Sequence, residues 1–209
     1  SPDWKNYEVK FRPDIWYNAY DGVQAGINVN GGYMNHHHLF DAAVWINTGV
    51  MQKADIKDVD LYDGFSYRLN YNTNLDEIAT NSRIWFNTQS LAGLYSSKLG
   101  LSKSDKSGKN KFSINLLTMY RPEYNDLNYL LYPKHWGVNK LNNRIDFSYE
   151  HKYKYLAGSG KLTFEVKNSA IGSEYDYNTL SLSAINSSKK GKLRFKTRGY
   201  FQFGSGTKW

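Results

Sequence analysis

Residues 65–72 decide the fold class, and they read Phe65-Ser66-Tyr67-Arg68-Leu69-Asn70-Tyr71-Asn72. Large apolar or aromatic side chains occupy every odd position of this stretch, and polar side chains occupy every even one. Because successive side chains of a β-strand point to opposite faces of the sheet, this alternation predicts a strand with one apolar and one polar face.

The same period of two recurs along most of the chain. It is clear at residues 7–12, 23–30, 112–116, 144–150, 161–167 and 192–203, and weaker at 38–51, 82–96 and 176–186. The apolar phase changes between Thr88 and Leu91, which predicts a β-bulge there. The connections are polar and turn-like. We therefore expect a single all-β domain over residues 1–209, an antiparallel meander of about ten strands.

The composition excludes several other classes of protein. The 209 residues include 27 Lys and Arg against 19 Asp and Glu, a formal net charge of +8, and 18 Tyr, 10 Phe and 6 Trp. So many aromatic residues are atypical of a disordered chain. Without cysteine the chain has no disulfide, thiolate metal site or cysteine nucleophile. The longest apolar run, Ala42 to Ile46, is far shorter than the ~18 residues of a transmembrane helix, so a helical membrane protein is excluded.

Two architectures fit the alternation. A soluble sandwich or lipocalin-like barrel points its apolar side chains into a core, whereas a transmembrane β-barrel points them into lipid around a polar lumen. Strands of about ten residues and a polar face rich in Asn, Gln, Ser, Thr and Arg favour the transmembrane barrel, whole or partial. The third indication is that Tyr and Trp cluster near the ends of predicted strands, where an interfacial girdle would lie. These residues are Trp16, Tyr17, Tyr20, Tyr62, Tyr120, Tyr153, Tyr155, Tyr175, Tyr177 and Tyr200.

Shared parity within each strand assigns side chains to the two sides of such a barrel. We expect lipid to meet Ile27, Phe65, Leu69, Ile114, Phe147, Phe164 and Phe195. The opposite parity predicts a lumen that contains Asn28, Arg68, Asn70, Asp146, Glu165 and Arg194. The soluble alternative exchanges the two sets.

Few residues resemble a chemical site. The run His36-His37-His38 falls in a predicted turn with no further ligand placed beside it, which favours a solvated loop over a metal site. No zinc-binding His-Glu-x-x-His helix, nucleophile elbow or phosphate-binding Gly loop occurs. We therefore expect no catalytic residue, metal ligand or cofactor in this chain. The carboxylates Asp41, Asp146, Glu150 and Glu165 are expected to form ion pairs with cations such as Arg68, Arg144 and Lys161.

A basic stripe marks the last predicted strand, where Lys192, Arg194, Lys196 and Arg198 share one face. At roughly 3.3 Å per residue these four cations would line about 20 Å of the lumen. Because like charges repel, they require either carboxylates on neighbouring strands or a wet lumen that attracts anions. The segment 176–186 offers only Asp176. No nucleic-acid-reading motif accompanies the stripe, so nucleic acid is not an expected partner.

Several phrases of the sequence resemble one family. They are Phe11 to Gly22, Gly32-Tyr33-Met34-Asn35, Phe40-Asp41-Ala42, Trp45 to Gly49, Asp126 to Pro133, Phe147 to Tyr153, Thr197-Arg198 and Gly204 to Trp209. Together they are similar to the C-terminal β-barrel-like region of large aminopeptidase-N-like (gluzincin) zinc metallopeptidases of Gram-negative bacteria. The phrases are structural, so the resemblance places no zinc ligand or catalytic base on any residue of this chain.

The resemblance implies a zinc-dependent catalytic domain before this region and further strands after it. We therefore expect a fragment of a longer chain, located in a bacterial outer membrane, that anchors or scaffolds a peptidase domain or partner outside these residues. The expected partners are the lipid bilayer and other outer-membrane or secretion-associated proteins. The alternative is a soluble β-domain that binds carbohydrate or another ligand through exposed Tyr and Trp.

Overall fold

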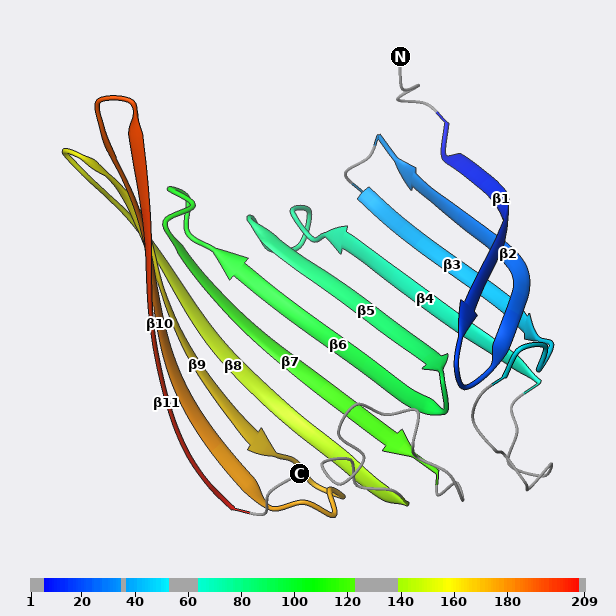
Figure 1. Ribbon diagram of the computed structural model, residues 1–209. Coiled ribbons are helices and arrows are strands. Elements are labelled where there is room, and N and C mark those ends of the chain that lie inside the picture. The colour runs from blue at the N-terminus through cyan, green and yellow to red at the C-terminus, as the bar shows by residue number, and fades with distance from the viewer. Residues whose placement is uncertain (1–5, 35–36, 53–63, 123–138, 207–209) are drawn as a thin grey trace.

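The computed structural model describes residues 6–34, 37–52, 64–122 and 139–206, and these ranges form strands joined by turns (Figure 1). The strands are β1 (Glu8–Asn18), β2 (Gly22–Tyr33), β3 (His37–Asn47), β4 (Phe65–Asn74), β5 (Ser82–Leu91), β6 (Leu94–Ser104), β7 (Asn110–Arg121), β8 (Lys140–Tyr155), β9 (Gly158–Ser169), β10 (Tyr177–Lys190) and β11 (Leu193–Gly206).

All eleven strands belong to one sheet, and each pairs antiparallel with its neighbours in sequence. The predicted all-β antiparallel meander is therefore confirmed. The sequence did not predict β6: only its first three residues fall within the stretch at 82–96, and residues 97–104 belong to no predicted strand. Its period is weak because small Ser residues stand at both parities.

The prediction of a β-bulge between Thr88 and Leu91 is wrong. Strands β5 and β6 pair from Ser82 opposite Lys103 to Leu91 opposite Leu94 with no register shift. The change of phase instead marks a hairpin turn at Ala92 and Gly93, whose φ values are 50° and 68°. Positive φ at both central residues is what a two-residue type I′ hairpin requires.

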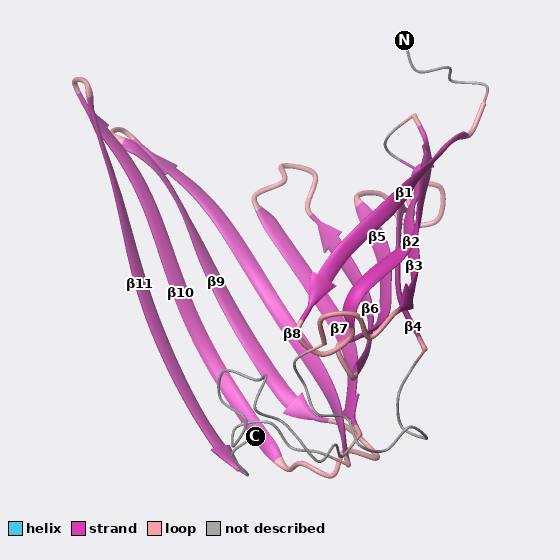
Figure 2. Ribbon diagram, turned by 45° about the vertical axis from the view of Figure 1, so that its right-hand side comes forward, coloured by secondary structure: helices cyan, strands magenta, loops and turns pink. Residues whose placement is uncertain are grey.

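The sheet is long-stranded and strongly curved. Its strands are 10 to 16 residues long, about twice the usual length in globular proteins. Figure 2 shows the sheet bending into an open trough, with β1 and β11 as its two edges. Within the described ranges no pairing joins these edges, and all 14 residues of β11 are exposed.

The register divides the side chains cleanly between two faces. Residues directly opposite each other in an antiparallel pair point to the same side, so each face can be followed from strand to strand. One face carries most of the Val, Ile, Leu and Phe side chains, and the other carries most of the Asn, Gln and charged ones. The polar face is the concave one: across the intervening β2, Trp45 Nε1 on β3 donates a hydrogen bond to Asp14 Oδ2 on β1 at 3.3 Å.

Candidate functional site

The apolar face of the sheet is exposed, although it carries the largest hydrophobic side chains. Phe65 retains 56% of its accessible surface, Ile27 58% and Phe147 45%. Among the residues that the structure describes, no second sheet or helix packs on this face. The register places on it all seven residues that the sequence assigned to lipid, namely Ile27, Phe65, Leu69, Ile114, Phe147, Phe164 and Phe195.

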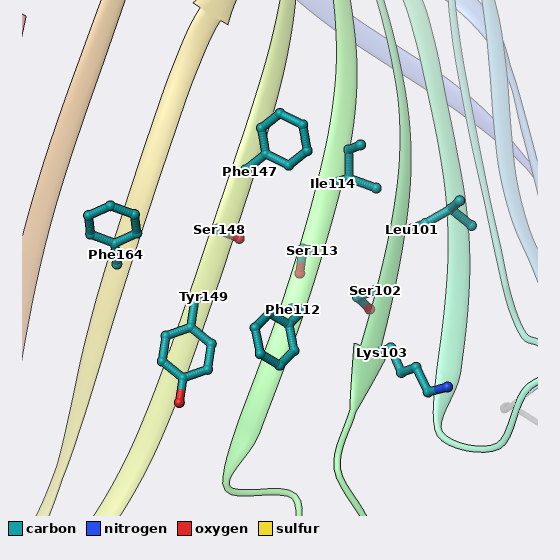
Figure 3. A pocket seen from close by; sticks show the side chains of 10 residues that line it. All are labelled: Leu101, Ser102, Lys103, Phe112, Ser113, Ile114, Phe147, Ser148, Tyr149 and Phe164. Carbon is teal, nitrogen blue, oxygen red and sulfur yellow. The ribbon is translucent and has the colours of Figure 1, made fainter.

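A shallow groove of about 500 Å³ lies on the apolar face over β6 to β9. Figure 3 shows Ile114, Phe147 and Phe164 projecting to the same side as Leu101 and Phe112, while Ser102, Ser113 and Ser148 project to the other. Phe147 lies directly opposite Ile114 and Val166. Over β7 to β9 the middle of this face is therefore apolar, and Lys103 lines the groove at the end of β6.

Tyrosines flank the apolar middle at both ends of the strands. Tyr95 and Tyr120 face each other at one end with ring centroids 6.5 Å apart, and Tyr153 and Tyr155 lie at the other end of the sheet, 6.3 Å apart. These positions are typical of an interfacial girdle.

Other members of the expected girdle occupy different environments. Tyr20, Tyr175 and Tyr177 are buried, and Trp16 and Tyr200 lie on the polar face. The girdle prediction is therefore wrong for these five, because proximity to a strand end does not determine which face a residue occupies. Tyr62 lies outside the described residues.

The concave face buries polar side chains. Gln24 and Asn28 have no exposed surface, and Asp146 and Asn115 retain 3% and 8%. Gln24 donates from Nε2 to Asn47 Oδ1 and to Ser66 Oγ, the second bond measuring 2.9 Å. A soluble protein buries apolar and exposes polar groups, so this sheet has the reverse arrangement.

Asp41 is the centre of a polar network over β2, β3 and β4. Its carboxylate accepts from Arg68 at 3.0 Å, from the Asn28 amide at 3.2 Å and from the Asn70 amide at 3.5 Å. Asn87 on β5 in turn donates to Asn70. Four adjacent strands are thus joined by side-chain hydrogen bonds on the concave face, which fixes their side-chain orientation.

Two of the tryptophans on the polar face lie opposite a glycine. Trp45 is directly opposite Gly26, and Trp85 is directly opposite Gly100. A Cβ on either glycine would overlap the facing indole ring, so the absence of a side chain makes room for it. The sequence did not identify these pairs, because the pairing of Gly with Trp depends on register.

The predicted ion pairs are confirmed. Arg144 forms two bonds to Asp146 on its own strand, Nε to Oδ1 at 2.6 Å and a terminal nitrogen to Oδ2 at 3.0 Å. The other pairs, each at 3.0 Å, are Arg68 with Asp41, Lys161 with Glu150 and Lys167 with Glu165. All four carboxylates therefore neutralise cations on the concave face.

The basic stripe differs in part from its prediction. Arg194, Lys196 and Arg198 lie on the polar face of β11, but Lys192 lies in the turn before this strand. All four are exposed, and among the described residues no carboxylate is within salt-bridge distance of any of them. The Arg198 guanidinium lies 5.8 Å from the Tyr200 ring centroid. Within the described ranges, β10 is the strand paired with β11, and it supplies no carboxylate to the stripe.

The histidines do not converge. His38 Nδ1 is 2.7 Å from the Tyr71 hydroxyl, and His36 lies outside the described residues. In the described part of the chain, no three His, Asp or Glu side chains are grouped closely enough to hold a metal ion. The same residues include no helix with the length and hydropathy needed to cross a membrane.

Two connections contain titratable groups in distinct environments. Burial raises the pKa of Tyr175 in the β9–β10 connection, and the negative charge of Glu174 raises it further. In the β6–β7 turn, desolvation acts to raise the pKa of Asp105, but hydrogen bonds from Asn110, Ser107 and the Lys109 backbone outweigh it and lower this pKa.

Compared with protein-family models, curated proteins and solved structures, the chain matches none of them. Functional inference therefore depends on the geometry of the two faces.

Proposed function

We propose that this chain is a membrane-spanning β-barrel region of a bacterial outer membrane, whose role is to anchor or scaffold a peptidase domain or partner outside these residues. The observation that carries the proposal is the reversed distribution of polarity: the concave face buries Gln24, Asn28 and Asp146, and the convex face exposes Phe and Ile. A single layer of sheet cannot bury its apolar face by itself. Lipid would cover the whole of that face at once.

The strands support this environment. A strand of 9–11 residues, tilted by about 45°, crosses the hydrocarbon core of a bilayer. The strands here are at least that long. Backbone groups at that depth must all be paired, so we infer that further strands, from the same protein or a partner, pair with β1 and β11.

The connections support an orientation. The two longest connections in the sequence join β3 to β4 and β7 to β8, whose joined ends lie at one end of the sheet, and β4–β5, β6–β7, β8–β9 and β10–β11 are joined at the other end (Figure 1). Periplasmic turns of outer-membrane barrels are short and extracellular loops are longer. The short-turn end would therefore face the periplasm, and a domain joined before β1 would lie on that side.

Some of the segments that resemble the metallopeptidase region meet in the fold. Two of them pack together on the concave face: Trp16 and Trp45 have ring centroids 5.7 Å apart, and Trp45 bonds to Asp14. This contact joins β1 to β3 across β2.

Spin labels on neighbouring residues test the assignment of the faces. In vesicles, labels at Leu69 and Phe164 should be accessible to oxygen dissolved in the lipid, and labels at Asn70 and Glu165 should be accessible to a water-soluble nickel complex. Each pair has adjacent residues on one strand and opposite faces, so each supplies its own control. The reverse pattern would contradict the membrane assignment and favour the alternative, a soluble β-domain that binds a ligand.

Removal of the region tests the anchoring role. A parent protein that lacks these residues should move from the outer-membrane fraction to the soluble periplasmic fraction and keep any activity of its remaining domain. Retention in the membrane would contradict the anchoring role.

A further inference from the structure

A row of cations crosses the concave face at the short-turn end of the sheet. The Lys152 backbone N–H donates to the Lys109 carbonyl at 2.8 Å, which continues the β7–β8 register by one residue. Lys152 lies directly opposite Lys161, Lys161 opposite Ile185, and Ile185 opposite Arg198. Lys109 in the turn before β7, Lys152 on β8, Lys161 on β9 and Arg198 on β11 therefore form a row on one face, with strands about 4.8 Å apart.

A cavity of about 700 Å³ lies along this row. Its lining includes the ammonium-bearing side chains of Lys109, Lys152, Lys154 and Lys161, and serine hydroxyls at positions 107, 159 and 187. Ser187 is directly opposite Lys196 of β11. The basic stripe therefore continues the same positive surface to the edge of the sheet.

The described carboxylates near this cavity do not balance the lysines. Glu150 is 3.0 Å from Lys161 and 3.6 Å from Lys152, so two ammonium groups share one carboxylate. Asp105 already accepts hydrogen bonds from Ser107, from Asn110 and from the Lys109 backbone within its own turn. Like charges directly opposite each other on a sheet are destabilising, so this arrangement favours an anion.

We propose that the cavity binds a soluble small molecule carrying several phosphate groups. Lysine binds phosphate as a point charge, and serine hydroxyls donate to the remaining phosphate oxygens. Several phosphates in series match ammonium groups that repeat from strand to strand better than one carboxylate does. The cavity opens on the polar face, away from the apolar one, so its ligand arrives from water. This inference goes beyond the anchoring role and does not depend on whether lipid or water covers the apolar face.

Tripolyphosphate is the probe for this site. Isothermal titration of the detergent-purified protein should show saturable binding that weakens as salt screens the charges. Lys161→Gln should reduce affinity by roughly three- to tenfold, the worth of one charge-assisted bond at a partly exposed site. The combined Lys109→Gln, Lys152→Gln and Lys161→Gln variant should lose binding, and Lys161→Arg should retain it.

Lys98→Gln is the matched control, because Lys98 lies on the same face, opposite Asn87 and Leu117, and does not line the cavity. It removes the same charge and should leave affinity unchanged. Equal weakening by Lys98→Gln and Lys161→Gln would show attraction to overall charge and overturn the site. Absence of saturable binding at about 0.1 M salt, where the screening length is ~10 Å, would overturn it as well. The spin-label experiment reads lipid contact, so failure here and failure of the membrane assignment are distinguishable.

Discussion

Replacing Phe147 with arginine distinguishes lipid from water at the centre of the apolar face. Phe147 is the eighth residue of the sixteen in β8, is 45% exposed and lies opposite Ile114 and Val166. No described acidic side chain lies directly opposite it on either neighbouring strand. An arginine at this position would therefore have neither water nor a counter-ion if lipid covers the face.

The expected magnitude differs between the two environments. An arginine at the bilayer midplane of an outer-membrane barrel costs about 2–4 kcal/mol of folding free energy. That cost is roughly a 30- to 1,000-fold change in the ratio of folded to unfolded protein. If water covered the apolar face, the same substitution would be an ordinary surface change, within about 0.5 kcal/mol.

Ser148→Arg is the control for this change. Ser148 points to the concave face and lies opposite Ser113 and Glu165, so a new arginine would have a carboxylate beside it. We expect its effect to stay within about 0.5 kcal/mol.

Urea unfolding in lipid vesicles, followed by tryptophan fluorescence, gives both free energies. Equal effects of the two substitutions, or a larger effect at Ser148, would refute the assignment of lipid to the convex face.

Three further predictions concern the concave face and a turn. Asp146→Ala should destabilise the fold by about 3 kcal/mol in urea unfolding because it leaves the largely buried Arg144 side chain without its carboxylate, and Arg144→Ala in addition should recover part of the loss. Gly100→Val should cost about 1–3 kcal/mol and change the near-ultraviolet circular dichroism of the displaced Trp85, whereas Gly199→Val, which has open space, should do neither. The pKa of Asp105 is lowered in the folded state, so the stability that its carboxylate adds to the β6–β7 turn is complete above the unfolded pKa of 3.8 and is lost as the pH falls below that value. Hydrogen exchange should show the turn opening at low pH, and Asp105→Asn should remove the pH dependence.

The sequence by itself determined the class of fold and the membership of the two faces. Alternation is a local property, because each residue's side relative to its neighbours follows from the pleat of its own strand. The parity of Phe65 and Leu69 against Arg68 and Asn70 therefore survived unchanged into the sheet. The ion pairs of Asp41, Asp146 and Glu150 were also predictable, since carboxylates and cations alternate on the same polar faces of the strands and attract each other across a sheet.

Only the tertiary structure decided the features that depend on register. Pairing between strands separated β5 from β6 at Ala92 and Gly93, set Gly100 against Trp85, and aligned Lys152 with Lys161. None of these follows from the period of two, because a strand keeps the same alternation whichever even shift it makes along its neighbour. The sense of the curvature had the same origin. In the folded sheet the polar side chains are buried on the concave face, and the apolar side chains are exposed on the outside.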